Sequence, residues 1–243
     1  LSGMIQFYAP DIATTHTLPE SDSQHCVKVL RKSPGDIIEV IDGKGRRFTC
    51  RLKEAHPKRA TVEILDSISI PPFWPNRIAI GVAPTKHLDR MEWLTEKLTE
   101  IGVNSITPLL CRNSERREIK SIRLEKIAVS AMKQSLKAIC PEICEMTPLK
   151  QYIDFTCHYQ QKFIAHCDSN HNRKMLSREY VPGKDTVIII GPEGDFSPEE
   201  INNAIASGFI PISLGDARLR TETAALAACG ICHTANQIAN IEN

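Results

Sequence analysis

Two glycine-bearing segments in the second half of the chain carry residue types that can bind and polarise a ligand. The first, residues 191–197, follows the β-branched apolar run at residues 186–190, which predicts a buried central strand ending in a glycine-rich turn. Ser197, Pro198 and Glu200 have the pattern of a capping box, so a helix is expected to begin there. In open α/β sheets, the loop between the carboxyl end of a strand and a helix is the usual place for a ligand.

A second segment repeats this arrangement and adds two arginines. A short strand is expected at residues 210–214, followed by a glycine and a polar turn into an Ala-rich helix. Thr221 is expected to cap that helix, and Glu222 suits its first turn. The positive end of the helix dipole, however, disfavours Arg218 and Arg220 at this place, and an anionic partner would explain them. If the two strands are neighbours, both loops face one pocket.

Spacing argues against several familiar chemistries. Residues 191–197 contain neither the Gly-Lys-Ser/Thr of a phosphate-binding loop nor the G-x-G-x-x-G of dinucleotide sites. Residues 229–233 spell the haem-attachment pattern C-x-x-C-H, but they lie inside the expected Ala-rich helix, so we interpret both cysteines as packing residues. No second cysteine pair stands at the spacing of zinc ligands, and we expect no metal.

Charge is unevenly distributed along the 243 residues, although the formal net charge is only +1. Residues 28–59 hold ten Lys and Arg against four acidic residues, and residues 112–137 hold eight against three. Two such regions in a nearly neutral chain favour a polyanion such as nucleic acid over a membrane surface. Solvated charged faces are the alternative interpretation.

Location is indicated by three features. No apolar run approaches the roughly 20 residues of a membrane helix, and no signal-peptide pattern opens the sequence. The nine cysteines are scattered without a disulfide framework, which favours reduced thiols. We therefore expect a cytoplasmic protein that does not bind membranes and whose natural sequence begins at Met4.

The pattern of elements changes once along the chain. Residues 5–68 read as short strands, with a hairpin around Asp42 and Gly43, which predicts a small β-barrel or sheet. Residues 71–75 form a stiff proline-rich connector. Beyond it, strands alternate with helices, which predicts a mostly parallel sheet. The expected parts are a β domain at residues 4–70, a linker at 71–76 and an α/β domain at 77–243.

Elements of the second part follow from hydrophobic periodicity. A helix is expected at residues 88–101, ended by Gly102, and a second helix at residues 122–136. The strands are expected at residues 77–82, 106–110, 162–167, 186–190 and 210–214.

A basic cluster precedes the expected hairpin. Lys28, Arg31 and Lys32 follow His25 at helical spacing, which is compatible with a helical face that contacts phosphates. Arg47 belongs to the same basic region. A lone histidine is more often a packing or surface residue, so His25 carries that alternative.

These motifs resemble those of the small-subunit ribosomal RNA uridine-N3 methyltransferases, the RsmE family of knotted (SPOUT-type) methyltransferases. Residues 25–31 are similar to the family's H-x-x-x-V-L-R, and residues 89–103 to its D-R-M…K-x-T-E-L-G-V. The most specific similarity lies in the two loops at residues 191–194 and 214–224. The resemblance runs over nearly the whole chain.

The resemblance implies both a fold and an activity. The fold would be an N-terminal PUA-like β-barrel that binds RNA and a C-terminal α/β domain with a deep trefoil knot, assembled as a homodimer. The activity would be transfer of a methyl group from S-adenosylmethionine to N3 of one uridine in 16S ribosomal RNA, either free or in the small ribosomal subunit.

This reaction suggests roles for individual residues. Our candidate for stabilising the uridine imide anion is Arg220, and our candidate for orienting the RNA phosphate or the base is Arg218. Glu222 or Glu193 would accept the imide proton, with helix support and loop shaping as their respective alternatives. The RNA contacts would be His25, Lys28, Arg31 and Arg47. The cofactor contacts would be Gly191, Pro192, Glu193, Gly194, Leu214, Gly215, Leu219, Thr221, Thr223 and Ala224.

The sequence departs from the family at four positions and leaves rival functions open. Asp195 stands where the family has a third glycine, and Lys137 stands near a usual arginine. Ala217 and Arg218 stand where the family has an arginine and an apolar residue. One rival is a related knotted enzyme that methylates a ribose 2′-hydroxyl or a transfer RNA base. Another is a noncatalytic RNA-binding assembly factor. A nucleotide hydrolase is disfavoured, because no phosphate-loop lysine is present.

Overall fold

The computed structural model describes residues 5–168 and 171–241, so the expected start at Met4 lies outside the described residues. The chain forms two compact units. The first contains the described residues up to Phe73 together with residues 129–140, and the second begins at Trp74 and contains the rest. The expected domain limits remain predictions, and the contribution of residues 129–140 to the first unit is a feature that the sequence did not indicate.

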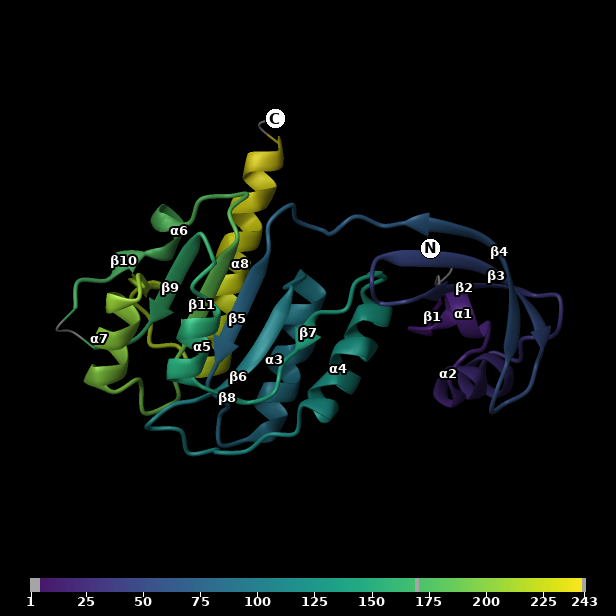
Figure 1. Ribbon diagram of the computed structural model, residues 1–243, viewed down its shortest axis with the longest axis horizontal. Helices are drawn as coiled ribbons and strands as arrows, with labels where there is room; N and C mark the ends of the chain where they lie inside the picture. The colour runs from purple at the N-terminus through teal and green to yellow at the C-terminus, as the bar shows by residue number, and fades with distance from the viewer. Residues whose placement is uncertain (1–4, 169–170, 242–243) are drawn as a thin grey trace. The chain divides into compact units, whose positions relative to one another are not determined.

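A four-stranded sheet in the order β1-β2-β3-β4 organises the first unit (Figure 1). Strand β1 pairs with β2 in parallel, and β2, β3 and β4 pair antiparallel. One face of the sheet packs on a core that includes Phe7, Val40 and Phe48. The elements are β1 (Gln6–Tyr8), α1 (Ile12–Thr15), α2 (Glu20–Gln24), a π-helical turn η1 (His25–Val29), β2 (Ile37–Ile41), β3 (Arg46–Glu54) and β4 (Thr61–Ser69).

The predicted hairpin is confirmed as β2 and β3. The Asp42 carboxylate accepts hydrogen bonds from the backbone N–H groups of Lys44 (2.7 Å) and Arg46 (3.0 Å), which closes the turn. The expected closure into a barrel, by contrast, is absent from the strand pairings of the described residues. Within the described part of the chain, a single bridge, Thr17 to Thr61, covers the outer edge of β4, because the chain turns into helices on either side of Thr17.

Residues 129–140 join the first unit through polar and apolar contacts. The Lys133 ammonium donates to the buried Asp22 carboxylate at 2.6 Å. Met132 and Ala138 pack with Ile41. The same carboxylate oxygen of Asp22 also accepts from the Tyr8 backbone N–H at 3.0 Å, so one buried charge links this segment to β1.

A wholly parallel sheet organises the second unit, in the order β10-β12-β9-β11-β5-β6-β7, with β8 also paired to β6. Its strands are β5 (Ile78–Val82), β6 (Ser105–Leu110), β7 (Glu142–Ile143), β8 (Thr147–Pro148), β9 (Gln161–Ala165), β10 (Lys174–Met175), β11 (Thr186–Ile190) and β12 (Ile210–Ser213). Its helices are α3 (Leu88–Ile101), the first part of α4 (Ser121–Gln134), α5 (Leu149–Phe155), α6 (Leu176–Glu179), α7 (Pro198–Ala206) and α8 (Thr221–Ile241). None of the helices in the described ranges is long and apolar enough to cross a membrane.

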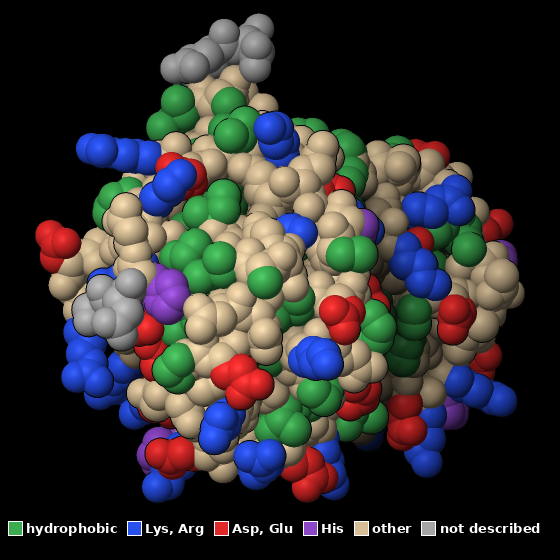
Figure 2. Space-filling view, turned by 60° about the vertical axis from the view of Figure 1, so that its left-hand side comes forward, with side chains coloured by type: hydrophobic (Ala, Val, Ile, Leu, Met, Phe, Trp, Pro, Cys, Tyr) green, Lys and Arg blue, Asp and Glu red, His purple; other side chains and the backbone are tan. Residues whose placement is uncertain are grey.

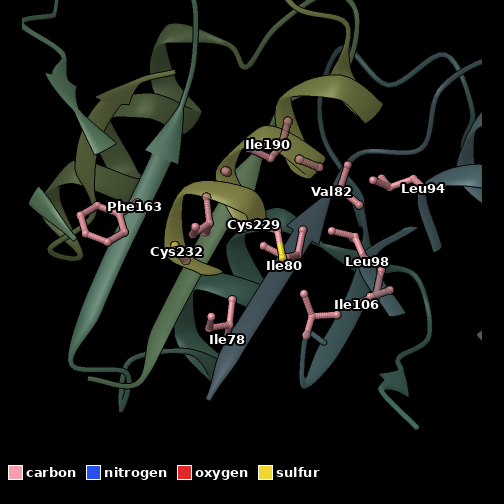
Figure 3. Packing of buried hydrophobic residues seen from close by; sticks show 14 of the residues in the cluster. Ile78, Ile80, Val82, Leu94, Leu98, Ile106, Phe163, Ile190, Cys229 and Cys232 are labelled. Atoms are coloured by element: carbon pink, nitrogen blue, oxygen red, sulfur yellow. The ribbon is translucent and has the colours of Figure 1, made fainter. Parts of the chain in front are cut away.

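Helices cover both faces of this sheet (Figure 1). Alternate residues of β5 and β11 face α3 and α8, while the residues between them face α5 and α7. The predicted α/β architecture is therefore confirmed. Cys229 and Cys232 of α8 point into the same hydrophobic cluster as Ile78 and Ile80, which supports their interpretation as packing residues (Figure 3).

The expected helix boundaries agree with the structure at the end of α3 and the start of α7, whereas α4 ends at Gln134, two residues before its expected end, and α8 begins differently. Gly102 ends α3 with a φ of 112°, and Ser197 forms the predicted capping box of α7 with Glu200. Thr221, however, is the first residue of α8 rather than its cap. Its hydroxyl donates to the Gly191 carbonyl at 3.0 Å instead of accepting from the helix.

A buried polar triad holds the second half of α8. Asn76 donates through Nδ2 to the Tyr180 hydroxyl (3.0 Å), and that hydroxyl donates to Oδ1 of Asn236 (2.9 Å). The Asn236 amide donates back to Oδ1 of Asn76 (3.2 Å). All three side chains are buried, so the removal of one member leaves hydrogen-bonding groups of the other two unsatisfied in the interior.

We predict that Asn236→Ala lowers the free energy of unfolding by about 2 kcal/mol, because it leaves polar groups of Asn76 and Tyr180 unsatisfied. Urea denaturation followed by circular dichroism measures the change. The control is Gln237→Ala at the exposed neighbouring position on α8, expected to change stability by less than about 0.5 kcal/mol. Equal effects of the two variants would contradict a role for the triad.

Candidate active site

A cleft of about 600 Å³ opens at the carboxyl ends of three adjacent strands, β12, β9 and β11. The start of α8 forms one side of it. Its size is that of a small-molecule site, and its position is the one expected for parallel α/β sheets. The lining residues are 165–167, 173, 190–195, 212–215, 217–221 and 224.

The first loop turns tightly at the end of β11. A Cβ atom at Gly191 would lie 3.0 Å from the Phe196 ring and 3.3 Å from the Asp195 carboxylate, so a side chain there would force these groups to shift by a few tenths of an ångström. Asp195 itself has a φ of 61°, the left-handed conformation that favours glycine. This backbone conformation accounts for the glycine that the family usually has at this position.

The second loop and the start of α8 complete the opposite wall. Gly215 has a φ of 118°, which lets the chain reverse after β12. The hydroxyl of Ser213 bonds with the backbone of Gly215 at 3.1 to 3.2 Å and stabilises this turn. Because the Thr221 hydroxyl donates to the Gly191 carbonyl, the second loop is joined directly to the first.

Neighbouring loops of the same unit form hydrogen bonds with the first loop. The Glu193 carboxylate accepts from the Lys86 backbone N–H at 3.1 Å. The Asn113 amide donates to the carbonyls of Gly194 (3.2 Å) and Asp195 (3.1 Å). Arg116 in turn donates to the Lys86 carbonyl at 2.7 Å. The loop is therefore fixed by hydrogen bonds to residues 86 and 113.

Three arginines lie at the cleft: Arg218 and Arg220 before α8, and Arg173 after the β9 exit. All three are exposed. Arg173 donates to the His166 carbonyl at 2.8 Å. Arginine guanidinium groups at a small-molecule cleft are suited to binding phosphate, carboxylate or a developing anion.

Glu222 and Thr223 lie apart from the cleft lining. Glu222 is buried and faces Arg90 of α3, with 3.7 Å between the Glu222 Oε1 and Arg90 Nε atoms. Thr223 is exposed on the first turn of α8. The other cofactor candidates, and Arg218 and Arg220 as catalytic candidates, lie on the lining.

His166, at the β9 exit, lines the cleft and was not among the sequence candidates. Burial lowers its pKa, while the Asp195 carboxylate opposes that shift. Its ring packs edge-on against His171, with centroids 5.5 Å apart. The imidazole is therefore favoured in its neutral form.

The predicted RNA contacts lie in the first unit. Lys28, in the π-helical turn, and Arg31, which follows it with a φ of 54°, are exposed. Arg47 lies on β3 opposite Ile41. His25 packs its ring against Phe7 at a centroid distance of 5.9 Å, which favours the packing role that was its alternative.

Charge on the surface is mixed. Figure 2 shows Lys and Arg side chains interspersed with Asp and Glu over one face, with hydrophobic side chains between them. No field of one sign covers this face, so its electrostatics alone do not mark an RNA-binding surface. Among residues 5–168 and 171–241, no three His, Cys, Asp or Glu side chains are grouped closely enough to hold a metal ion.

Sequence reasoning missed the β9 exit, residues 165–167, and Arg173. The strand itself was predicted, but its place between β11 and β12 was not, and that place brings its carboxyl end into the cleft. The predicted strand at residues 162–167 ends in the structure at Ala165, and the position of residues 165–167 at its carboxyl end was the available signal.

Comparison with known proteins agrees with this geometry. Residues 72–233 match the family described as RNA methyltransferase domain, and residues 18–65 match the RNA methyltransferase PUA domain. The ribosomal RNA small subunit methyltransferase E of Buchnera aphidicola is 31% identical over 90% of this chain and 87% of the relative.

Two solved structures are similar over almost the whole chain. A protein described as a probable rRNA-methyltransferase from Porphyromonas gingivalis has a TM-score of 0.92 at 44% identity, covering 97% of this chain and 99% of that one. The ribosomal RNA small subunit methyltransferase E of Neisseria gonorrhoeae, bound to S-adenosyl methionine, has a TM-score of 0.80 at 30% identity, covering 96% and 98%. The chain therefore belongs to the RNA methyltransferase family, within the group of ribosomal RNA small subunit methyltransferases E.

Proposed function

We propose that this protein transfers a methyl group from S-adenosylmethionine to N3 of one uridine in 16S ribosomal RNA. The observation that carries the proposal is the cleft in which two glycine-bearing loops meet beside Arg220. The choice of uridine N3 comes from the resemblance of residues 191–194 and 214–224 to the uridine-N3 enzymes. The bound S-adenosyl methionine of the Neisseria gonorrhoeae relative supports the choice of cofactor.

The residues of the cleft fit this cofactor. Ile190, Ile212, Leu214 and Leu219 offer apolar surface for an adenine ring, and glycine turns in both loops bring main-chain groups close to a ligand. We assign cofactor binding to residues 191–194, 212–215, 219, 221 and 224. When bound, S-adenosylmethionine supplies an activated methyl group on its sulfonium.

Arg220 is assigned to the base that is methylated. Uridine N3 carries an imide proton at neutral pH and is a poor nucleophile until that proton leaves. A guanidinium beside the base stabilises the developing imide anion, and its contribution is largest where water is excluded. Arg218, exposed next to the same cleft, is assigned to orienting an RNA phosphate or the base.

The positions of the two candidate proton acceptors decide between them. Glu193 lies on the cleft lining, whereas Glu222 faces Arg90 away from it. We therefore assign proton acceptance to Glu193 and helix positioning to Glu222. One oxygen of Glu193 already accepts from the Lys86 backbone, which holds the carboxylate in place.

The trefoil knot and the homodimer implied by the resemblance belong to the same proposal. The TM-scores of 0.92 and 0.80 to relatives support a shared chain path in the second unit. Lys28, Arg31 and Arg47 of the PUA-like part are assigned to RNA phosphates, and His25 to packing beneath them.

We predict that 16S ribosomal RNA from cells lacking this protein loses one 3-methyluridine, and that purified protein with S-adenosylmethionine restores it. Nucleoside mass spectrometry identifies the product. Loss of a 2′-O-methyl nucleoside instead, or of a methylated transfer RNA base, would favour the related knotted enzyme. An unchanged nucleoside profile together with retained RNA binding would favour a noncatalytic assembly factor.

We predict that Arg220→Ala lowers the methylation rate by about 100-fold, because the imide anion loses its cation. Calorimetric titration should find S-adenosylmethionine affinity within about threefold of wild type, because cofactor contacts lie mainly on the loop backbones. Arg178→Ala, at an exposed position on α6, serves as the control with both quantities unchanged. Equal loss of rate and affinity would reassign Arg220 to the cofactor.

We predict that replacing Lys28, Arg31 and Arg47 together by Gln weakens RNA binding and makes it less sensitive to salt. The slope of log affinity against log salt should fall by about one for each phosphate that the variant no longer neutralises. Filter binding over a range of salt concentrations measures both. A matched triple variant of Lys53, Lys58 and Arg59, exposed in the same unit, removes equal charge and should have a smaller effect. Equal effects of the two triple variants would mean that only total charge matters.

A further inference from the structure

We propose that Asp195 is a positioning residue that clamps the exit of β9 to the first loop and so presets the cofactor cleft before S-adenosylmethionine binds. This inference rests on the proposed function. It concerns the position where the chain departs from the third glycine of the family. The clamp joins two of the three strand ends that form the cleft.

The clamp consists of two hydrogen bonds to one carboxylate. Oδ2 of Asp195 accepts from the Cys167 backbone N–H at 2.8 Å, across 28 positions of sequence. Oδ1 accepts from the Phe196 backbone N–H at 2.8 Å, which fixes the side-chain orientation. Hydrogen bonds to an ionised carboxylate are among the stronger ones in proteins.

The backbone conformation of Asp195 indicates that its carboxylate does more than allow the chain to turn at this position. At a φ of 61°, glycine would adopt the required conformation without strain, and aspartate adopts it at a cost. The Asp195 N–H donates to the Pro192 carbonyl at 2.9 Å, and any residue with an N–H can supply that turn bond. The side-chain bond to Cys167 is therefore what distinguishes aspartate from glycine here.

Gly191 leaves the space that the clamp needs. A Cβ atom at this position would lie 3.3 Å from Oδ1 of Asp195 and 3.0 Å from the Phe196 ring. A side chain there would crowd the carboxylate and the Phe196 ring. The glycine of the first loop thus permits the contact to β9 as well as close approach of a ligand.

A second hydrogen bond restrains the same β9 exit. Arg173 donates to the carbonyl of His166, the residue next to Cys167, at 2.8 Å. Consecutive residues of the β9 exit are thus held by one carboxylate and one guanidinium, and both lie on the cleft lining. A wall ordered in advance improves cofactor affinity, because less conformational freedom is lost on binding.

The decisive variant is Asp195→Gly, which removes the clamp and relieves the backbone strain, so the protein is expected to fold. We expect the S-adenosylmethionine Kd to rise about fivefold by calorimetry, the change expected when one such hydrogen bond is removed. KM for S-adenosylmethionine should rise in parallel, with kcat within about twofold. Tm should stay within about 3 °C of wild type. An unchanged Kd, or a fall in kcat with constant KM, would overturn the proposal.

The Asp195→Asn variant distinguishes the effect of the hydrogen bond to Cys167 from the effect of the carboxylate charge. Asparagine tolerates this backbone conformation and its amide oxygen can accept from Cys167, so its Kd should lie closer to wild type than that of the glycine variant. Equal increases of Kd in both variants would assign the effect to charge and overturn the clamp. Glu199→Gln, an exposed acid on α7 outside the lining, controls for nearby charge and should bind normally.

The rate of hydrogen exchange at the Cys167 backbone amide measures whether the clamp is formed in the absence of a ligand. Its exchange should be faster in Asp195→Gly than in wild type and unchanged in Glu199→Gln. Equal exchange in all three proteins would overturn the clamp. Failure of the wild-type protein to bind S-adenosylmethionine would instead refute the proposed function, so the two failures are distinguishable.

Discussion

The hydrogen bond from the Thr221 hydroxyl to the Gly191 carbonyl is the contact on which the candidate site depends. It joins the first residue of α8 to the end of β11, although 30 positions separate them. Both groups are buried, so neither can exchange its partner for water without cost. Through this bond the two glycine-bearing loops become walls of one cleft, and Arg220, the residue before Thr221, is held beside them. A shift of α8 along the sheet would break the bond and separate the arginine from the cofactor loops.

The rest of the second unit keeps that contact in place. Alternating residues of β5 and β11 bury both faces of a parallel sheet, so the strand ends cannot slide independently. The triad of Asn76, Tyr180 and Asn236 holds α8 farther along its length. The first loop is then held by hydrogen bonds to Asn113 and Lys86. A rigid frame with exposed arginines at its rim combines a preformed cofactor cleft with access for a large RNA.

Sequence reasoning reached the local features and missed the spatial ones. The strand at residues 186–190, the capping box at Ser197 and the helix end at Gly102 follow from short-range chemistry, and the structure confirms them. The order β12-β9-β11 has no signature in a single sequence, so the contribution of residues 165–167 to the cleft was missed. Asp195 was noticed as a departure, but its partner lies 28 positions away. Residues 129–140 were likewise placed by contacts to Asp22 and Ile41 that no local pattern encodes.

The central claim is that both loops enclose one methyl donor beside Arg220. A crystal structure with S-adenosylmethionine tests it most directly. The account predicts electron density for the cofactor between residues 191–194 and 212–215, with the methyl group directed toward the side of the cleft that carries Arg220. Density bound elsewhere, or a methyl group directed away from that arginine, would contradict it.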